Sequence, residues 1–119
     1  MSKKIMIFDD DKTILSIFSI VLEASGYTVE ISETSHDIIE RVEVAMPDVI
    51  IMDNWIPDIG GIEATQLLKK NAKFKHIPVV YCSANSDIES LADRAGAEAY
   101  LPKPFDLVDL EQTIERLVG

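Results

Sequence analysis

Three short apolar runs, each followed by a polar residue, constrain the fold of this chain more than any other feature. They are Lys4–Phe8, Asp48–Asp53 and Ile77–Cys82. Runs this short and this apolar are typical of strands buried on both faces, as in the middle of a parallel sheet. Polar side chains at the C-terminal ends of such strands lie where open parallel sheets bind their ligands. The sequence therefore predicts a site at one edge of a parallel sheet.

Amphipathic helical patterns separate the strands along the whole chain. Apolar residues recur at helical spacing from Ile14 to Leu22, and Gly26 stands at the position of a C-terminal cap. Further helices are expected at Thr34–Met46, at Ile62–Asn71, between Ser86 and Gly96, and after Asp106, which caps the last one. Thr34 with Asp37, and Ser86 with Glu89, resemble capping boxes. Strict alternation of strands and helices predicts a parallel sheet with right-handed crossovers.

The strand patterns also predict an order within the sheet. The three apolar runs should be central, whereas Thr28–Ser32 alternates polar and apolar residues as a half-exposed edge strand does. Glu98–Leu101 precedes Pro102, and proline is tolerated best at a sheet edge. The predicted fold is therefore a flavodoxin-like, doubly wound (βα)5 three-layer sandwich with strand order 2-1-3-4-5.

Size and charge narrow the class of protein. A chain of 119 residues is expected to form one domain, residues 1–119. A formal net charge of -10 argues against direct binding of nucleic acid, which rewards clustered lysine and arginine. No apolar run approaches the length of a membrane span, no signal-peptide pattern follows Met1, and Cys82 is the single cysteine. These features predict a cytoplasmic protein without membrane insertion.

The strand ends should gather acidic side chains that need a cation. Asp9, Asp10 and Asp53 end adjacent strands, whose backbones lie about 4.8 Å apart in any sheet. Two carboxylates about 5 Å apart repel by on the order of 3 kcal/mol at an effective dielectric constant of 20. Oxygen ligands alone favour Mg²⁺, with Mn²⁺ as an alternative. Ser83 and Lys103 end two further strands and add a hydroxyl donor and an ammonium group, which completes a set suited to phosphoryl transfer.

Four segments carry a resemblance to a known family. They are Ile5–Asp11, the loop with Asp53, Pro57 and Gly61, then Val79–Ala84, and Tyr100–Phe105. With these segments in this order at strand ends, the chain resembles the receiver domain of two-component response regulators over essentially its whole length.

The resemblance implies a phosphoprotein that carries an aspartyl phosphate. Its donor would be a phosphohistidine of a sensor histidine kinase or of a histidine phosphotransfer protein, and its acceptor Asp53. Asp10, Asp53 and the backbone carbonyl of Trp55 would bind Mg²⁺ directly, and Asp9 largely through water. The domain would catalyse its own phosphorylation and a slow autodephosphorylation, without being an enzyme in the usual sense.

The resemblance also implies how phosphorylation of Asp53 would change a surface that a target protein binds. Ser83 and Lys103 would bind the phosphoryl oxygens, and Lys103-Pro104 would be a cis peptide bond. Ser83 would couple to Tyr100, which turns inward on phosphorylation and alters a surface for an unidentified target protein. Trp55 and Asn85 would tune the lifetime of the phosphoryl group. Plain packing of Tyr100 on an edge strand is the competing interpretation.

One residue of the site loop departs from the family pattern, and several charged residues elsewhere have no predicted role. Gly60 stands where the family often has an acidic or amide residue, so a more pliable loop is expected there. The lysines between positions 69 and 75 read as a solvated helix end, and His36 and His76 as exposed side chains.

Other functions remain open at this point. Asp9, Asp11 and Thr13 also fit the motif of haloacid dehalogenase phosphatases, with Asp9 as the nucleophile. A flavin-binding module and a receiver that no longer takes phosphate are further alternatives. The acidic loop after the first strand argues against a flavin phosphate, and intact Asp53, Ser83 and Lys103 argue against the degenerate receiver.

Overall fold

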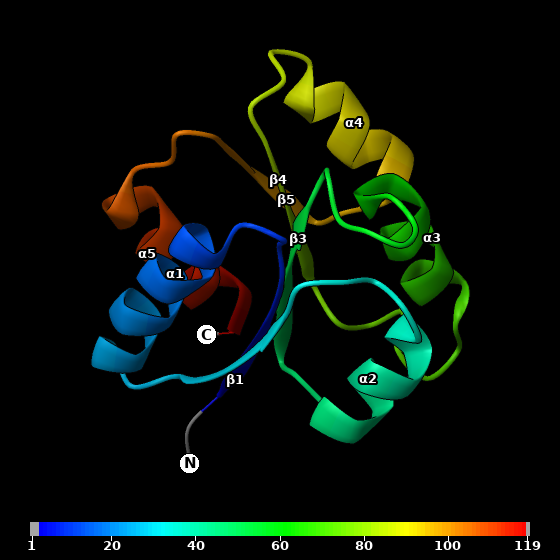
Figure 1. The fold of residues 1–119 in the computed structure, drawn as a ribbon, viewed down its shortest axis with the longest axis horizontal. Coiled ribbons are helices and arrows are strands. Elements are labelled where there is room, and N and C mark those ends of the chain that lie inside the picture. The colour runs from blue at the N-terminus through cyan, green and yellow to red at the C-terminus, as the bar shows by residue number, and fades with distance from the viewer. Residues whose placement is uncertain (1–2, 119) are drawn as a thin grey trace.

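The computed structural model describes residues 3–118, and alternating strands and helices follow one another through them (Figure 1). Every strand is parallel to its neighbours. The strands are β1 (Lys4–Phe8), β2 (Thr28–Ser32), β3 (Val49–Asp53), β4 (Val79–Ser83) and β5 (Ala99–Pro102). The helices are α1 (Lys12–Ala24), α2 (Ile38–Ala45), α3 (Gly61–Lys70), α4 (Ile88–Ala95) and α5 (Leu107–Val118).

The strand order β2-β1-β3-β4-β5 confirms the predicted topology. Helices α1 and α5 cover one face of the sheet and α2, α3 and α4 the other, so the sheet is the middle of three layers (Figure 1). The order reverses between β1 and β3, which places the C-terminal ends of these two strands beside each other. This reversal is the crevice in which doubly wound sheets bind ligands.

The core follows the apolar runs of the sequence. All five residues of β3 and of β4 are buried, whereas β5 exposes alternate residues and β2 exposes Thr28, Glu30 and Ile31 at the two edges of the sheet. One cluster packs β1 and β3 against α1 and α5, with Phe18 stacked on Phe105 at 4.8 Å between ring centroids. A second packs the other face against α2 and α3. Among residues 3–118, no helix has the length and apolar character needed to cross a bilayer.

Two predicted capping boxes are wrong. Helix α2 begins at Ile38 rather than Thr34, because the Thr34 hydroxyl accepts from the His36 amide in a local turn and Asp37 adopts left-handed backbone angles. Helix α4 begins at Ile88, since the Asn85 side chain accepts from the Asp87 amide and so closes a turn around Ser86. The predicted cap at Asp106 is confirmed, since its carboxylate accepts from the Val108 amide, and Asp11 caps α1 by accepting from the amides of Thr13 and Ile14.

Lys69 differs from the expectation of a solvated helix end. Its ammonium donates to the carbonyl of Ile77 at 2.7 Å and to the carboxylate of Glu98 at 2.7 Å. Glu98 in turn accepts from the Val79 amide at 2.8 Å. This lysine therefore ties the end of α3 to the starts of β4 and β5.

Candidate functional site

Three carboxylates meet at the C-terminal ends of β1 and β3. Oxygens of Asp9, Asp10 and Asp53 all lie within 4.8 Å of one another. Asp9 and Asp53 are buried and Asp10 is exposed, so the cluster opens to solvent on one side. The strands bring these residues together because β1 and β3 are paired in register up to Phe8 and Met52, immediately before the acidic residues.

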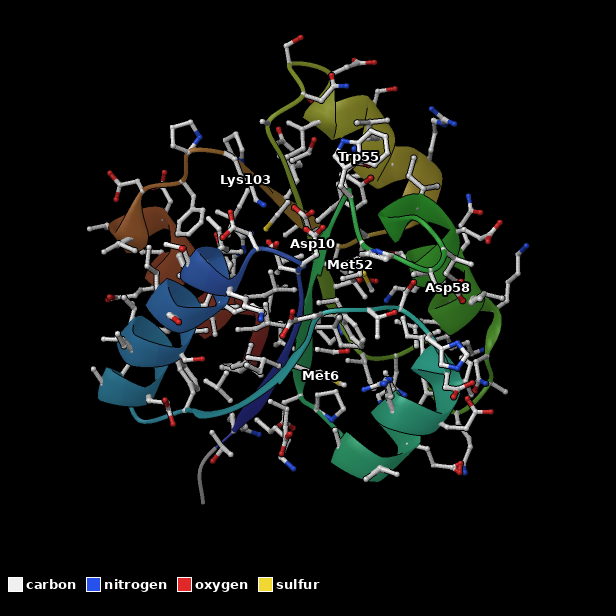
Figure 2. The ribbon with its side chains drawn as sticks, in the orientation of Figure 1. Met6, Asp10, Met52, Trp55, Asp58 and Lys103 are labelled. Atoms are coloured by element: carbon white, nitrogen blue, oxygen red, sulfur yellow. The ribbon has the colours of Figure 1, made fainter. Side chains whose placement is uncertain are left out.

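Lys103 reaches this cluster from the loop after β5. Its ammonium donates to Asp53 Oδ1 at 2.6 Å and to Asp9 Oδ2 at 3.0 Å. Figure 2 shows Lys103, Asp10 and Trp55 at the same end of the sheet, on loops that follow three different strands. The Lys103 amide donates to the carbonyl of Ser83 at 2.8 Å, and the Lys103-Pro104 bond is cis, as the resemblance implied.

The carboxylates of Asp53 and Asp9 compete for the ammonium group of Lys103, and this affects the pKa values of Asp53 and Lys103. Burial raises the pKa of Asp53, the hydrogen bond from Lys103 lowers it, and the charge of Asp9 raises it again, with a net increase. Burial lowers the pKa of Lys103, but its hydrogen bonds to Asp53 and Asp9 outweigh this, and the net direction is upward. Two buried carboxylates therefore share a single ammonium group, and the raised pKa means that the site disfavours the ionised form of Asp53.

The loop after Asp53 is held close to the strand end. The Trp55 amide donates to Asp53 Oδ2 at 3.0 Å, and the Gly61 amide donates to the carbonyl of Asn54 at 3.1 Å. A side chain at Gly61 would collide with the carbonyl oxygen of Asp53, whereas one at Gly60 would find its nearest atom 4.0 Å away. The glycine that this loop requires is thus Gly61, which is also the glycine of the family motif.

Ser83 completes the ring of strand ends. It is buried at the end of β4, and its hydroxyl oxygen accepts from the Asn85 amide at 3.0 Å. Asn85 itself is exposed, and Trp55 is 79% exposed on the rim of the site. Three carboxylates, a lysine and a hydroxyl are therefore gathered at one edge of the sheet.

Comparison with known proteins identifies the family. The model of the response regulator receiver domain matches residues 5–115. The chain belongs to the response regulator receiver domain family. The polar-differentiation response regulator DivK of Brucella ovis is 31% identical over 122 residues, covering 100% of this chain and 98% of the relative. Family membership decides against the phosphatase and flavin alternatives.

Solved structures agree with this assignment. A putative response regulator from Chloroflexus aurantiacus has a TM-score of 0.93 at 26% identity, covering 99% of this chain and 98% of its own. The chemotaxis response regulator CheY4 of Vibrio cholerae has a TM-score of 0.90 at 26% identity, covering 98% of this chain and 99% of its own. Receiver domains are signalling domains of two-component systems, which act with histidine kinases and downstream targets.

The acidic cluster of this receiver domain fits a hard divalent cation. Three carboxylates face a single ammonium group, which leaves an excess of negative charge in a half-buried site. Every candidate ligand atom in the cluster is an oxygen, which suits Mg²⁺ or Mn²⁺. Asp10, the exposed member, is the one that Lys103 does not contact.

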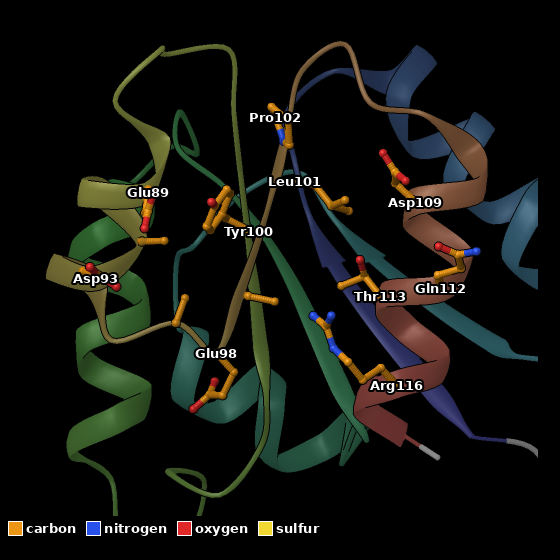
Figure 3. A pocket seen from close by; sticks show the side chains of 13 residues that line it. Glu89, Asp93, Glu98, Tyr100, Leu101, Pro102, Asp109, Gln112, Thr113 and Arg116 are labelled. Atoms are coloured by element: carbon orange, nitrogen blue, oxygen red, sulfur yellow. The ribbon is translucent and has the colours of Figure 1, made fainter.

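Tyr100 lies away from the acidic cluster, on the outer edge of the sheet. It is 41% exposed and lines a groove of about 510 Å³ between α4 and α5 (Figure 3). Tyr100 pairs with Tyr81 of β4, and Pro102, two residues further along β5, pairs with Ser83. In this structure Tyr100 therefore faces solvent, one strand away from Ser83.

Sequence analysis overlooked one polar contact of this receiver domain. The hydroxyl of Tyr81, a fully buried residue of β4, donates to the side-chain oxygen of Asn54. Burial, and next the charge of Asp53, raise the pKa of Tyr81 to about 12, so the hydroxyl is a donor at neutral pH. A tyrosine in the middle of an otherwise apolar strand was the available signal. Its neighbour Cys82 is buried as predicted, and burial raises the pKa of its thiol to about 12.

Proposed function

We propose that this receiver domain, residues 1–119, accepts a phosphoryl group on Asp53 from a phosphohistidine. The donor is a sensor histidine kinase or a histidine phosphotransfer protein in the cytoplasm. The observation that carries the proposal is Asp53 itself, a buried carboxylate at a strand end with Lys103 bound at 2.6 Å and two further carboxylates beside it. A bond forms between an Asp53 oxygen and phosphorus as the bond from phosphorus to the histidine nitrogen breaks.

The remaining carboxylates prepare the site for this transfer. Asp10, Asp53 and the Trp55 carbonyl would hold Mg²⁺, with Asp9 acting through water. When bound, the cation neutralises charge on the phosphoryl oxygens and positions them. Asp9 also accepts from the Asp11 amide at 2.9 Å, so the carboxylate is fixed by backbone and by Lys103 before any ligand arrives.

Lys103 and Ser83 would receive the transferred group. Lys103 already contacts the attacking carboxylate, so a phosphoryl oxygen on Asp53 comes within reach of the same ammonium. Ser83 supplies a neutral hydroxyl from the adjacent strand, since Asp53 pairs with Cys82 and Ser83 follows directly. Donors fixed in place before reaction stabilise the equatorial oxygens without reorganisation.

Residues on the rim would set how long the phosphate lasts. Trp55 and Asn85 are exposed on either side of the strand ends, on the loops after β3 and β4. Bulk at these positions limits the approach of water to the acyl phosphate. Slow autodephosphorylation by this route would end the signal.

The output of the proposed switch is the surface of α4, β5 and α5. Ser83 would move toward the phosphoryl group and Tyr100 would turn inward, which changes the groove that Tyr100 now lines. A target protein that binds one form better would shift the equilibrium by its differential affinity.

Labelling with acetyl phosphate tests the phosphoacceptor. We expect incorporation in the presence of Mg²⁺ or Mn²⁺, loss of it with EDTA, and complete loss in Asp53→Asn. Asp9→Asn should slow labelling and weaken metal binding without abolishing either. Intact-protein mass spectrometry with peptide mapping gives the site. A phosphate on Asp9, or labelling that survives excess EDTA, contradicts the proposal.

A further inference from the structure

Tyr81 joins the phosphoacceptor loop to helix α4. Its side chain is fully buried, and its ring belongs to a cluster with Ile88, Ala92 and Ala95 of α4. At its tip the hydroxyl donates to the side-chain oxygen of Asn54, the residue directly after Asp53. A buried hydroxyl is costly without a partner, so this contact fixes both side chains.

Asn54 is thereby held at three atoms. Its amide donates to the carbonyl of Cys82 at 2.9 Å, and its own carbonyl accepts from Gly61 at 3.1 Å. Its side-chain oxygen accepts from Tyr81. Backbone contacts with β4 and α3 hold the main chain, and Tyr81 holds the side chain from the interior.

The residues on either side of Asn54 are the ones that the proposed reaction uses. Asp53 precedes it, and Trp55 follows it and donates its amide to Asp53 Oδ2 at 3.0 Å. The Asn54–Trp55 peptide carries the Trp55 N–H that makes this hydrogen bond, and the Trp55 carbonyl lies in the peptide that follows. The anchor at Asn54 therefore lies between the two residues that supply proposed metal ligands, the Asp53 carboxylate and the Trp55 carbonyl.

We infer that Tyr81 is a positioning residue for the divalent cation, acting through Asn54. The inference rests on the proposed function and deepens it. Tyr81 does not touch the cation or the phosphoryl group; it holds the Asn54 side chain, and so fixes the residue between Asp53 and Trp55. Supporting hydrogen bonds of this kind set the precision of a site.

The test is a Mg²⁺ titration of Tyr81→Phe, which removes one oxygen from a buried ring. Trp55 is the single tryptophan and lies two residues from Asp53, so its fluorescence reports on the site. The loss of one hydrogen bond should raise the Kd for Mg²⁺ about three- to tenfold. Amide hydrogen exchange of Asn54 and Trp55 should become faster. Tyr27→Phe, the same change beyond the opposite end of the sheet, should alter neither.

A double-mutant cycle separates positioning from general destabilisation. Asn54→Ala should weaken Mg²⁺ binding to a similar degree as Tyr81→Phe. The double variant should then bind Mg²⁺ no more weakly than the single variant with the lower affinity. Additive losses, or wild-type Mg²⁺ affinity in Tyr81→Phe, overturn the inference. Mg²⁺-dependent labelling of the wild type on Asp53 supports the proposed function, whatever the outcome of the double-mutant cycle. Absence of such labelling in the wild type contradicts the proposed function, and the inference about Tyr81 then fails as well.

Discussion

The folded protein disfavours the ionised form of the Asp53 carboxylate, and this lowers the free energy of unfolding at neutral pH. Burial and the charge of Asp9 raise its pKa in the folded protein above the ordinary value of 3.8. A raised pKa favours the protonated carboxyl, so this contribution to stability is present at low pH and is lost as the pH rises through the folded-state pKa. At neutral pH and without a divalent cation, the ionised carboxylate therefore destabilises the fold.

Replacing this carboxylate should stabilise the cation-free protein. We expect Asp53→Asn, in EDTA at pH 7, to have a free energy of unfolding about 1 kcal/mol higher than the wild type. In calorimetry this corresponds to a Tm about 3–6 °C higher. The gain should shrink toward pH 4, and Mg²⁺ should raise the Tm of the wild type only. Glu111→Gln, on the exposed side of α5, matches the change in net charge and should leave Tm unchanged. An equal rise in both variants would point to net charge instead.

Gly61 should tolerate no side chain, although Gly60 beside it should. A Cβ at Gly61 collides with the main-chain oxygen of Asp53, which cannot move without shifting Asp53 itself. We expect Gly61→Ala to lower the free energy of unfolding by about 1–3 kcal/mol in urea denaturation. Gly60→Ala has ordinary backbone angles and open space, so its effect should stay within about 0.5 kcal/mol. Equal stabilities for the two variants would contradict the geometry.

At the scale of elements, the strands were predictable from the sequence, but the starts of α2 and α4 were not. Asp9, Asp53, Ser83 and Lys103 could be placed together because buried parallel strands all end at one edge of the sheet. Thr34 and Ser86 misled because a hydroxyl or amide near a helix start can close a local turn instead of a cap. Asn54 with Tyr81 was missed because contacts between distant polar residues leave no periodic signal in a sequence.

Lys69 links three elements and should matter for folding. Its ammonium serves a carbonyl before β4 and the carboxylate of Glu98 before β5, and its side chain is only 15% exposed. Lys69→Met keeps the length of the side chain and removes the donor. Because Glu98 is partly exposed, we expect a loss of about 1–2 kcal/mol by urea denaturation. Lys70→Met, on the exposed side of the same helix, should change stability by less than about 0.5 kcal/mol.

At the scale of the whole molecule, the proposed switch connects the strand ends to a surface on the far edge of the sheet. Ser83 and Tyr100 lie on paired strands, with Ser83 opposite Pro102 and Tyr81 opposite Tyr100. Tyr100 now lines the groove between α4 and α5 with carboxylates of both helices, among them Asp93 and Asp109 (Figure 3). Inward rotation of this one ring would remove part of the groove wall. A local change at Asp53 would thereby alter a surface that a partner can read.

Ser83→Ala should cut this connection while leaving the phosphoacceptor intact. Beryllofluoride, a phosphoryl mimic, should shift the NMR signals of residues 85–110 in the wild type, because a charged group at Asp53 draws in the Ser83 hydroxyl. In Ser83→Ala it should still bind at Asp53 but shift only residues that contact the site. Ser86→Ala, an exposed serine on the same loop, should keep the wild-type pattern. Shifts confined to the site in the wild type would remove α4, β5 and α5 as the output surface. Full propagation in Ser83→Ala would keep that surface and assign the coupling to another residue.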